Sequence, residues 1–282
     1  MSDVAPGSAP LITRFAPSPN GSLHLGHAYS AIVAHDLAQA AGGRFLLRIE
    51  DIDGPRSRPE LADEFRRDLE WLGLEWEEVP AQSTRLETYA AAANNLLDRG
   101  LLYRCNLSRK EVAALPVRVG QDGLEYPGSA RGSSSLQEGE EGAALRLDID
   151  RAMDEAGELW WSDEIAGRVK ADPRGFGDVV LVRKHLPASY HLAATLDDAS
   201  DGVNLVTRGM DLFEASHIHR LLQALLSLPV PRWHHHRLLL DEDGKKLAKR
   251  RGSPSLAARR EAGESGLMLT EQLRMQKFEL GT

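Results

Sequence analysis

Two short segments, more than two hundred residues apart in the chain, carry side chains suited to phosphate chemistry. The first contains His24, Gly26 and His27 in the pattern His-Leu-Gly-His, and the second contains Lys246 and Lys249 in Lys-Leu-Ala-Lys-Arg. The first segment follows an apolar run and leads into a helical pattern. Its imidazoles and glycines are therefore expected at a strand-to-helix turn, where backbone N–H groups favour phosphate. Because the lysines would supply cations for the same phosphates, the two segments together predict a nucleotide site.

Each segment also has a simpler interpretation. The pattern His-x-Gly-His can form a tight turn with solvated histidines, and a Lys/Arg cluster is usually an exposed surface. Packing of His24 and His27 in a core is less favoured, because Gly21 and Gly26 leave the backbone open to the approach of a ligand. The pairing of the two segments is more specific than either one.

In form, order and separation, the two segments resemble the hallmark motifs of the class I aminoacyl-tRNA synthetases. Three further segments resemble the glutamyl branch of that family: RFAPSPNG at residues 14–21, RIEDID at 48–53 and TRGMD at 207–211. The resemblance covers roughly residues 11–250 and is weaker between about 104 and 175.

The resemblance implies roles for both segments in binding ATP. His24, Gly26 and His27 would contact the nucleotide, and the two histidines would steady the pentavalent α-phosphate. Lys246 and Lys249 would hold the triphosphate, with Lys249 as the principal cation. Positioning and electrostatics supply most of the catalysis in such a reaction.

The second segment departs from the family motif at one position. The motif usually carries a serine between its lysines, where this chain has Ala248. Both cations remain, so a modest change in rate is expected in place of a loss of activity. Magnesium is expected to accompany ATP, because it bridges phosphate oxygens.

The charges of glutamate predict the composition of its pocket. With two carboxylates and one ammonium group, glutamate requires about two cations and one anion, each buried charge being paired. By resemblance, Arg14 and Arg208 would bind the carboxylates. Glu50 would face the ammonium group, and Tyr190 would donate from its hydroxyl. The resemblance adds to this pocket a run of four residues, with the last at the entry: Phe15, Ala16, Pro17 and Ser18.

Other interpretations of these charges are open. The acidic residues of RIEDID could form a metal or acid/base cluster, and Arg208 could form a surface ion pair. The strand alternation around Arg48 favours the pocket, because it places Glu50 at the carboxyl end of a strand, where α/β sheets bind ligands. Asp197 and Asp198, which the family also matches, are expected to be structural.

The chain is not expected to bind zinc. Relatives in the glutamyl-queuosine branch of the family often bind zinc through Cys-x-Cys, a tyrosine and a later cysteine. Here Leu107 follows Cys105 and Ala130 follows Tyr126, so two of the four ligands of a closed tetrahedral site are missing. The run of three histidines at residues 234–236 is expected to pack in the fold, since alternate side chains of a strand face opposite sides.

The elements that would position these residues alternate between strand and helix. Helical spacing of apolar residues occurs near 32–37, 61–72, 86–97 and 212–225, and Asp211 is placed to cap the last helix. Strands are expected at 45–49, 179–182, 203–206 and 238–240. This alternation predicts an α/β fold with a parallel sheet. The resemblance implies a Rossmann-type sheet split by an insertion, with a short helical C-terminal tail.

The same resemblance divides the chain into four parts. Residues 1–103 and 176–240 would be the two halves of the nucleotide-binding domain. Residues 104–175 would be a loop-rich insertion with the remnant of a zinc site, and 241–282 would hold the KLAKR segment and the tail. The Gly/Ser/Glu-rich stretch at 128–142 is expected to be a mobile loop.

Composition restricts the compartment and the partners. No long apolar run or leader pattern occurs, so a cytoplasmic protein is expected, and the single Cys105 excludes an intrachain disulfide. The formal charge of −8 opposes general capture of nucleic acid. RNA contacts are therefore expected to be local, and residues 245–260 hold seven Lys/Arg and no carboxylate. A monomer is expected.

The sequence after Arg250 is shorter than an independent domain of about 50 residues. Conventional glutamyl-tRNA synthetases carry a helical anticodon-binding part there, so the shortened form resembles the glutamyl-queuosine branch. That branch activates glutamate without tRNA and transfers it to queuosine at the wobble position of tRNA(Asp). The implied partners are L-glutamate, ATP and the tRNA(Asp) anticodon loop. The alternatives are a truncated synthetase that charges a tRNA 3′ end, a non-catalytic paralogue that binds amino acid or RNA, and an adenylyl transferase of similar architecture.

Overall fold

The computed structural model describes residues 9–107, 110–111, 119–120, 123–124, 143–186, 188–239 and 254–279. The chain divides into two compact units. Unit 1 comprises Met1–Ala81, Asp201–Met210 and Pro231–Thr282, and unit 2 comprises Gln82–Ser200 and Asp211–Val230.

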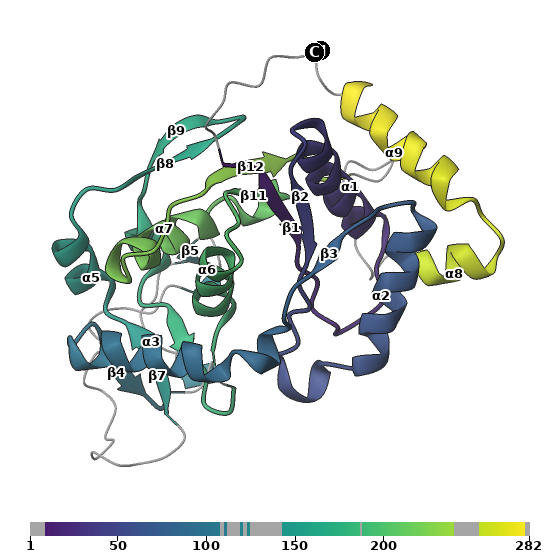
Figure 1. Cartoon of the computed structure of the whole chain (residues 1–282). Helices are drawn as coiled ribbons and strands as arrows, with labels where there is room; N and C mark the ends of the chain where they lie inside the picture. Colours follow the sequence, from purple (N-terminus) through teal and green to yellow (C-terminus); the bar gives the residue numbers. More distant parts are fainter. Residues whose placement is uncertain are drawn as a thin grey trace. The chain divides into compact units, whose positions relative to one another are not determined.

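Two groups of parallel strands form the centre of unit 1 (Figure 1). The first comprises β1 (Ile12–Phe15), β2 (Arg44–Leu47) and β3 (Glu77–Glu78), and the second comprises β11 (Leu205–Gly209) and β12 (Arg232–His236). β2 pairs with both β1 and β3, and β11 pairs with β12. β11 lies beside β1, where Asn204 N donates to Ile12 O at 3.1 Å and Ile12 N donates to Asn204 Oδ1 at 2.8 Å. The carboxyl ends of β2, β1 and β11 are therefore neighbours.

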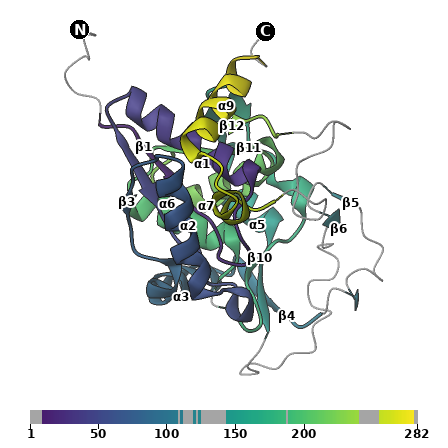
Figure 2. The ribbon, with the colours of Figure 1, turned by 90° about the vertical axis from the view of Figure 1, so that its right-hand side faces the viewer.

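Within the part of unit 1 that the structure describes, four α-helices and one 3-10 helix accompany these strands. They are α1 (Leu25–Ala40), η1 (Gly54–Arg56), α2 (Pro59–Trp71), α8 (Leu256–Glu261) and α9 (Gly266–Glu279). α9 packs on α1 and α8 packs on α2 (Figures 1 and 2). One hydrophobic cluster joins strands and helices, and it includes Phe15, Ile32, Phe45, Phe65, Leu256 and Leu273. Burial of this apolar surface is the main stabilisation of unit 1.

Polar contacts also attach the C-terminal helices. Arg274 Nη2 donates to Asp36 Oδ1 at 2.8 Å on α1, and Arg260 Nε donates to Asp68 Oδ1 at 3.2 Å on α2. Gly266 approaches α2 so closely that a Cβ atom there would lie 1.9 Å from the carbonyl oxygen of Trp71. The short helical tail expected from the sequence is thus confirmed, and it is an integral part of unit 1.

Unit 2 combines helices with antiparallel strands. Its helices are η2 (Gln82–Thr84), α3 (Leu86–Asp98), α5 (Ile149–Ala156), η4 (Pro173–Phe176), α6 (Tyr190–Ser200) and α7 (Ala215–Leu225). Its strands are β4 (Leu102–Cys105), β5 (Val119–Gly120), β6 (Gly123–Leu124), β7 (Ala144–Leu147), β8 (Trp160–Asp163), β9 (Gly167–Lys170) and β10 (Val180–Val182). β7 pairs antiparallel with β4 and β10, and β8 with β9. A 3-10 helix, η5 (Met210–Leu212), follows β11.

The α/β fold and most of the expected elements are confirmed. Two expectations were wrong. Among the described residues the last strand is β12, because pairing with β11 ends at His236. Leu238 and Leu239 lie outside any strand, and Leu240 lies outside the described residues. The N-cap of α7 is Glu214, whereas Asp211 lies in η5. The four-part division stays a prediction, and the stretch 128–142 lies outside the described residues. Among the helices that are described, none is long and apolar enough to cross a membrane.

Candidate functional site

Two segments singled out in the sequence run side by side in unit 1. Backbone hydrogen bonds join Arg48 N to Phe15 O and Glu50 N to Pro17 O, each at 3.1 Å. These bonds extend the β1–β2 pairing beyond the ends of both strands. Phe15 and Pro17 are buried, while Ala16 and Ser18 are partly exposed. The predicted pocket residues 14–18 therefore run alongside residues 46–50, with Pro17 directly beside Glu50.

Two buried arginines lie in the adjacent strands β1 and β11. Arg14 is 5% exposed, and its Nη1 donates to the carbonyl oxygen of Thr207 at 2.9 Å. Arg208, which follows Thr207 in β11, is 4% exposed, and its Nε donates to His235 Nε2 at 3.2 Å. Buried guanidinium groups require hydrogen-bonding partners, and the planar fork of each suits a carboxylate. This part of unit 1 can therefore bind an acidic ligand.

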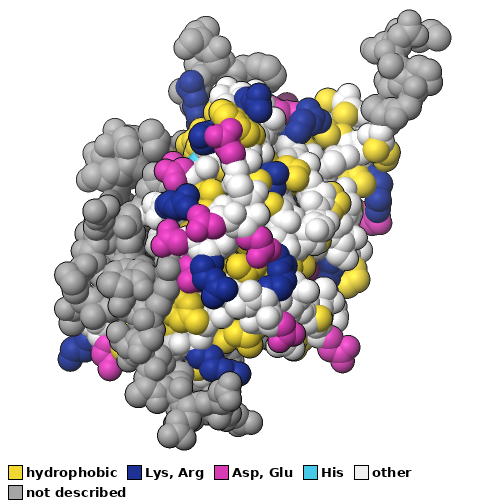
Figure 3. Space-filling view, turned by 90° about the vertical axis from the view of Figure 1, so that its left-hand side faces the viewer, with side chains coloured by type: hydrophobic (Ala, Val, Ile, Leu, Met, Phe, Trp, Pro, Cys, Tyr) yellow, Lys and Arg dark blue, Asp and Glu magenta, His cyan; other side chains and the backbone are white. Residues whose placement is uncertain are grey.

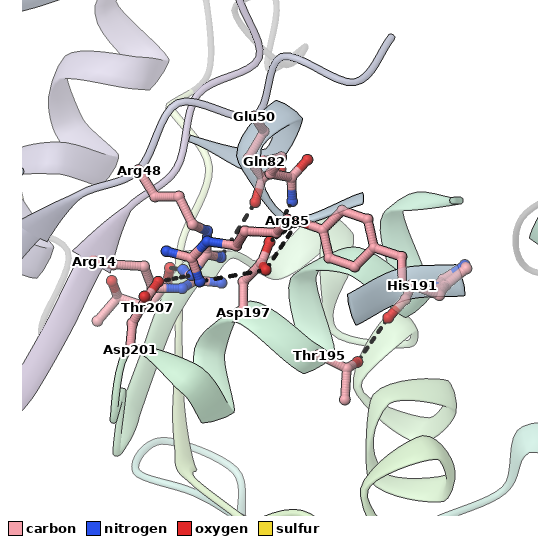
Figure 4. Close-up of polar contacts among 11 residues, drawn as sticks. Arg14, Arg48, Glu50, Gln82, Arg85, His191, Thr195, Asp197, Asp201 and Thr207 are labelled. Carbon is pink, nitrogen blue, oxygen red and sulfur yellow. Dashed lines mark hydrogen bonds and ion pairs between the residues drawn. The ribbon is translucent and has the colours of Figure 1, made fainter. Parts of the chain in front are cut away.

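Glu50 is a buried carboxylate that is paired with Arg48, which is completely buried (Figure 4). Arg48 Nη2 donates to Glu50 Oε1 at 3.2 Å, and Arg48 Nη1 donates to Asp201 Oδ2 at 2.9 Å. Sequence analysis assigned no separate role to Arg48 and did not identify Asp201. The only signal was the place of Arg48 in the motif RIEDID, because Asp201 lies 153 residues further along the chain.

The histidines of the first segment form the beginning of α1. His24 is the N-cap, and its Nδ1 accepts from Gly26 N at 3.1 Å. His27 Nδ1 accepts from His24 N at 3.2 Å, and the ring centroids are 3.9 Å apart. With Nδ1 as acceptor, the proton of each neutral ring lies on Nε2. Each of the two stacked rings then carries its N–H group on Nε2, beside a helix N-terminus, which is a position that favours anions.

Lys246 and Lys249 lie outside the described residues. The chain before and after residues 240–253 nevertheless contacts α1 or the residues just before it. On one side, His236 Nε2 lies 2.8 Å from Ser30 Oγ. On the other side, Leu256 N donates to Leu23 O at 2.9 Å. Both attachments flank the turn that carries His24.

Tyr190 belongs to unit 2, where it is the first residue of α6. Its ring centroid is 5.6 Å from that of His191 and 5.3 Å from that of His219. One side chain further along α6, Asp197, is 1% exposed and accepts from several donors. These are Gln82 Nε2 at 2.7 Å and Arg85 Nη1 at 3.4 Å (Figure 4), together with Tyr89 OH at 2.9 Å. They hold α6 against η2 and α3.

The residues considered for metal binding occupy separate positions. His235 contacts Arg208, whereas His236 contacts Ser30 from the opposite face of β12. Cys105 is buried at the end of β4. Tyr126 and Ala130 lie outside the described residues. No group of three or more His, Cys, Asp or Glu side chains suited to a metal occurs among those the structure describes, and the absence of zinc stays a prediction.

Comparison with known proteins adds to this geometry. Residues 10–279 match the family model of the class I tRNA synthetases (E and Q), catalytic domain. The Glutamyl-Q tRNA(Asp) synthetase of Rhodobacter capsulatus is 48% identical over 268 residues, which cover 90% of this chain and 96% of that protein. The protein of the same name from Deinococcus radiodurans is 43% identical over 258 residues, covering 89% and 84%.

A solved structure is also similar. It is a glutamate tRNA ligase from Elizabethkingia meningosepticum in complex with its amino acid, with a TM-score of 0.77 and 25% identity. The match covers 95% of this chain and 61% of that protein, so the chain spans less than two thirds of the solved ligase. With nearly its whole length matched by the family model, this chain belongs to the class I tRNA synthetases of the E and Q type.

Proposed function

We propose that this chain activates L-glutamate with ATP and transfers the glutamyl group to queuosine in tRNA(Asp). The main support for the proposal is the arrangement of three motifs, which lie in unit 1 except for Asp211. RFAPSPNG, RIEDID and TRGMD meet at the neighbouring carboxyl ends of β1, β2 and β11. The names of the relatives, which match about 90% of this chain, support the same reaction.

The charges in unit 1 suit glutamate. Arg14 and Arg208 supply two guanidinium groups for its carboxylates, and Glu50 supplies a carboxylate for its ammonium group. Ser18, partly exposed beyond β1, lines the entry. Tyr190 is assigned the role of a hydroxyl donor from the family resemblance.

ATP is assigned to the turn before α1. The Nε2–H groups of His24 and His27 would donate to phosphate oxygens, and Gly26 brings the backbone close to the nucleotide. Lys246 and Lys249 would neutralise the charge that develops on pyrophosphate. Their assignment is supported by the attachment of both flanks of residues 240–253 beside this turn. Magnesium would enter as the counterion of the ATP phosphates.

The reaction has two steps. The α-carboxylate oxygen of glutamate attacks the α-phosphorus of ATP, and the bond from that phosphorus to the oxygen of pyrophosphate breaks. A hydroxyl of the queuosine cyclopentenediol then attacks the glutamyl carbonyl carbon. AMP leaves with the electron pair of the acyl bond, and the proton of the hydroxyl passes to the departing phosphate or to water. The protein would act mainly by orienting groups and by stabilising charge.

Recognition of tRNA is expected to be local. The formal charge of the chain is −8, and Figure 3 shows a face where Lys and Arg side chains are interspersed with Asp and Glu. Such a surface gives little general attraction for a polyanion. The anticodon loop of tRNA(Asp) would therefore be bound by a limited set of contacts around the active site.

Pyrophosphate exchange tests the first step. Glutamate should support incorporation of labelled pyrophosphate into ATP without any tRNA, while glutamine and aspartate should not. The same preparation, given labelled glutamate, should label tRNA(Asp) that contains queuosine and should leave tRNA(Asp) with guanosine unlabelled. Equal labelling of the two tRNAs would contradict the proposed acceptor, and an absence of glutamate-dependent exchange would contradict activation.

The alternatives give different results in these assays. A synthetase that charges a tRNA 3′ end would label tRNA(Glu), and periodate oxidation of the terminal ribose would abolish the labelling. A non-catalytic paralogue would give no exchange. In an adenylyl transferase, Arg208→Ala would leave the ATP chemistry unchanged.

A further inference from the structure

Arg48 places a cation between two carboxylates in the interior of unit 1. Its side chain is 0% exposed, and those of Glu50 and Asp201 are 8% and 6% exposed. Removing each such charge from water costs several kcal/mol before pairing is counted, and apolar residues of similar volume are often at least as stable. The stability of the fold therefore does not by itself account for the burial of these three charges.

The geometry of the contacts restricts Glu50. Its backbone is held by the hydrogen bond from Glu50 N to Pro17 O at 3.1 Å. Its Oε1 is held by Arg48 Nη2 at 3.2 Å. Because both oxygens of a carboxylate share one plane, a guanidinium that holds one oxygen orients the whole group. One hydrogen bond at the backbone and one at the side chain thus fix the position and orientation of the Glu50 carboxylate.

Asp201 limits how strongly Arg48 neutralises Glu50. Its contact with the guanidinium, at 2.9 Å, is shorter than the 3.2 Å contact of Glu50. One positive charge is thus shared between two carboxylates. Glu50 is held in place without losing all of its attraction for a second cation.

We propose that Arg48 and Asp201 are positioning residues, which orient Glu50 and preserve its negative charge for the ammonium group of the amino acid. The inference rests on the proposed function, in which Glu50 faces that ammonium group. It assigns to Arg48 and Asp201 the selection of an amino acid over a dicarboxylate that lacks the ammonium group. Neither residue would touch the substrate.

The test measures glutamate-dependent pyrophosphate exchange in the full-length chain. Arg48→Lys keeps the positive charge but removes the planar guanidinium that contacts both carboxylates. It should raise the KM for glutamate by about 10- to 100-fold, as expected for the loss of a hydrogen bond to a charged group. The kcat and the KM for ATP should stay within about threefold. Asp201→Asn should also raise the KM for glutamate, because Arg48 would then neutralise Glu50 more completely.

Inhibition by glutarate separates positioning from a general loosening of the pocket. Glutarate has both carboxylates of glutamate but no ammonium group. Its inhibition constant should therefore be nearly unchanged in Arg48→Lys, in Asp201→Asn and in Glu50→Gln. Arg48→Lys combined with Glu50→Gln should be no worse than Glu50→Gln alone, because residues that act through one contact are not additive.

Arg274→Gln is the matched control. It also removes a guanidinium paired with a carboxylate of unit 1, Asp36, and it should leave every kinetic and inhibition constant unchanged.

If Arg48→Lys does not fold, as judged by circular dichroism, the nearly isosteric Asp201→Asn decides the question. Unchanged KM values for glutamate in an active enzyme, or equal weakening of glutamate and glutarate, would overturn the positioning role alone. A wild-type chain without glutamate-dependent exchange would instead overturn the proposed function and, with it, this inference.

Discussion

Leu256 donates its backbone N–H to the carbonyl oxygen of Leu23 at 2.9 Å. Leu23 directly precedes His24, the N-cap of α1, and Leu256 begins α8. The C-terminal helices therefore attach to the turn that carries the candidate phosphate-binding histidines. This relationship explains how a tail of two helices can support a site that is formed near the other end of the chain.

Substitution can separate the proposed phosphate contact of His24 from its observed role as the N-cap of α1. His24→Ala should lower the kcat of pyrophosphate exchange by about 10²- to 10³-fold, the effect of losing one donor to a transition-state charge. It should also cost about 1 kcal/mol of stability through loss of the N-cap. His24→Asn restores a good cap and should recover the free energy of unfolding but not the kcat. Recovery of exchange by the asparagine would show that His24 only caps the helix.

Arg208 is predicted to recognise a glutamate carboxylate. Arg208→Gln should raise the KM for glutamate by about 100-fold and change the KM for ATP little, since a bidentate contact with a charged group is lost. Steady-state pyrophosphate exchange measures both constants. Arg44→Gln is the control, because it breaks an exposed ion pair with Glu77 in the same unit. Equal effects of the two substitutions would contradict the assignment.

Substitution of Gly266 at the start of α9 should lower the free energy of unfolding. Gly266→Ala would place a Cβ atom 1.9 Å from the carbonyl oxygen of Trp71, so α9 would have to move away from α2. The expected cost is about 1 to 3 kcal/mol in the free energy of unfolding, measured by thermal or denaturant unfolding. Gly175→Ala is the control, because its Cβ would meet nothing within 4 Å. A wild-type melting temperature in Gly266→Ala would contradict the observed approach of the two helices.

Asp68 should make stability depend on pH. Burial raises the pKa of Asp68 from 3.8 to about 6, against the opposing effect of Arg260. A carboxyl group whose pKa is raised on folding stabilises the protein below its unfolded pKa, and this contribution is lost as the pH rises through the folded pKa. The free energy of unfolding, relative to that of Asp68→Asn, should fall by up to about 3 kcal/mol between pH 4 and pH 7. A constant difference between the two proteins over that range would contradict the raised pKa.

Local patterns in the sequence predicted the elements that carry the motifs. Helical spacing of apolar residues located α1, α2 and α3, and the alternation around Arg48 located the end of β2. Sequence analysis did not predict α5, β8 and β9, which lie in the stretch 104–175 that was expected to be rich in loops. A signal for α5 was present in Asp148, whose carboxylate accepts from Arg151 N at 3.0 Å as the N-cap.

Contacts between distant parts of the chain could not be predicted in this way. The contact between Arg48 and Asp201 and the bond from Arg208 to His235 depend on which strands become neighbours. Burial of charged or polar side chains such as these contradicts their usual preference for the surface. The sequence motifs therefore indicated which residues could bind glutamate, while the fold was needed to find the groups that hold them.

A crystal structure with L-glutamate and a nonhydrolysable ATP analogue would test whether one site binds both substrates. His24, His27 and Lys249 should all lie within hydrogen-bonding distance of one triphosphate, while Arg14 and Arg208 contact the carboxylates of glutamate and Glu50 contacts its ammonium group. A triphosphate bound away from the turn before α1, or glutamate bound without Arg14 and Glu50, would contradict this arrangement.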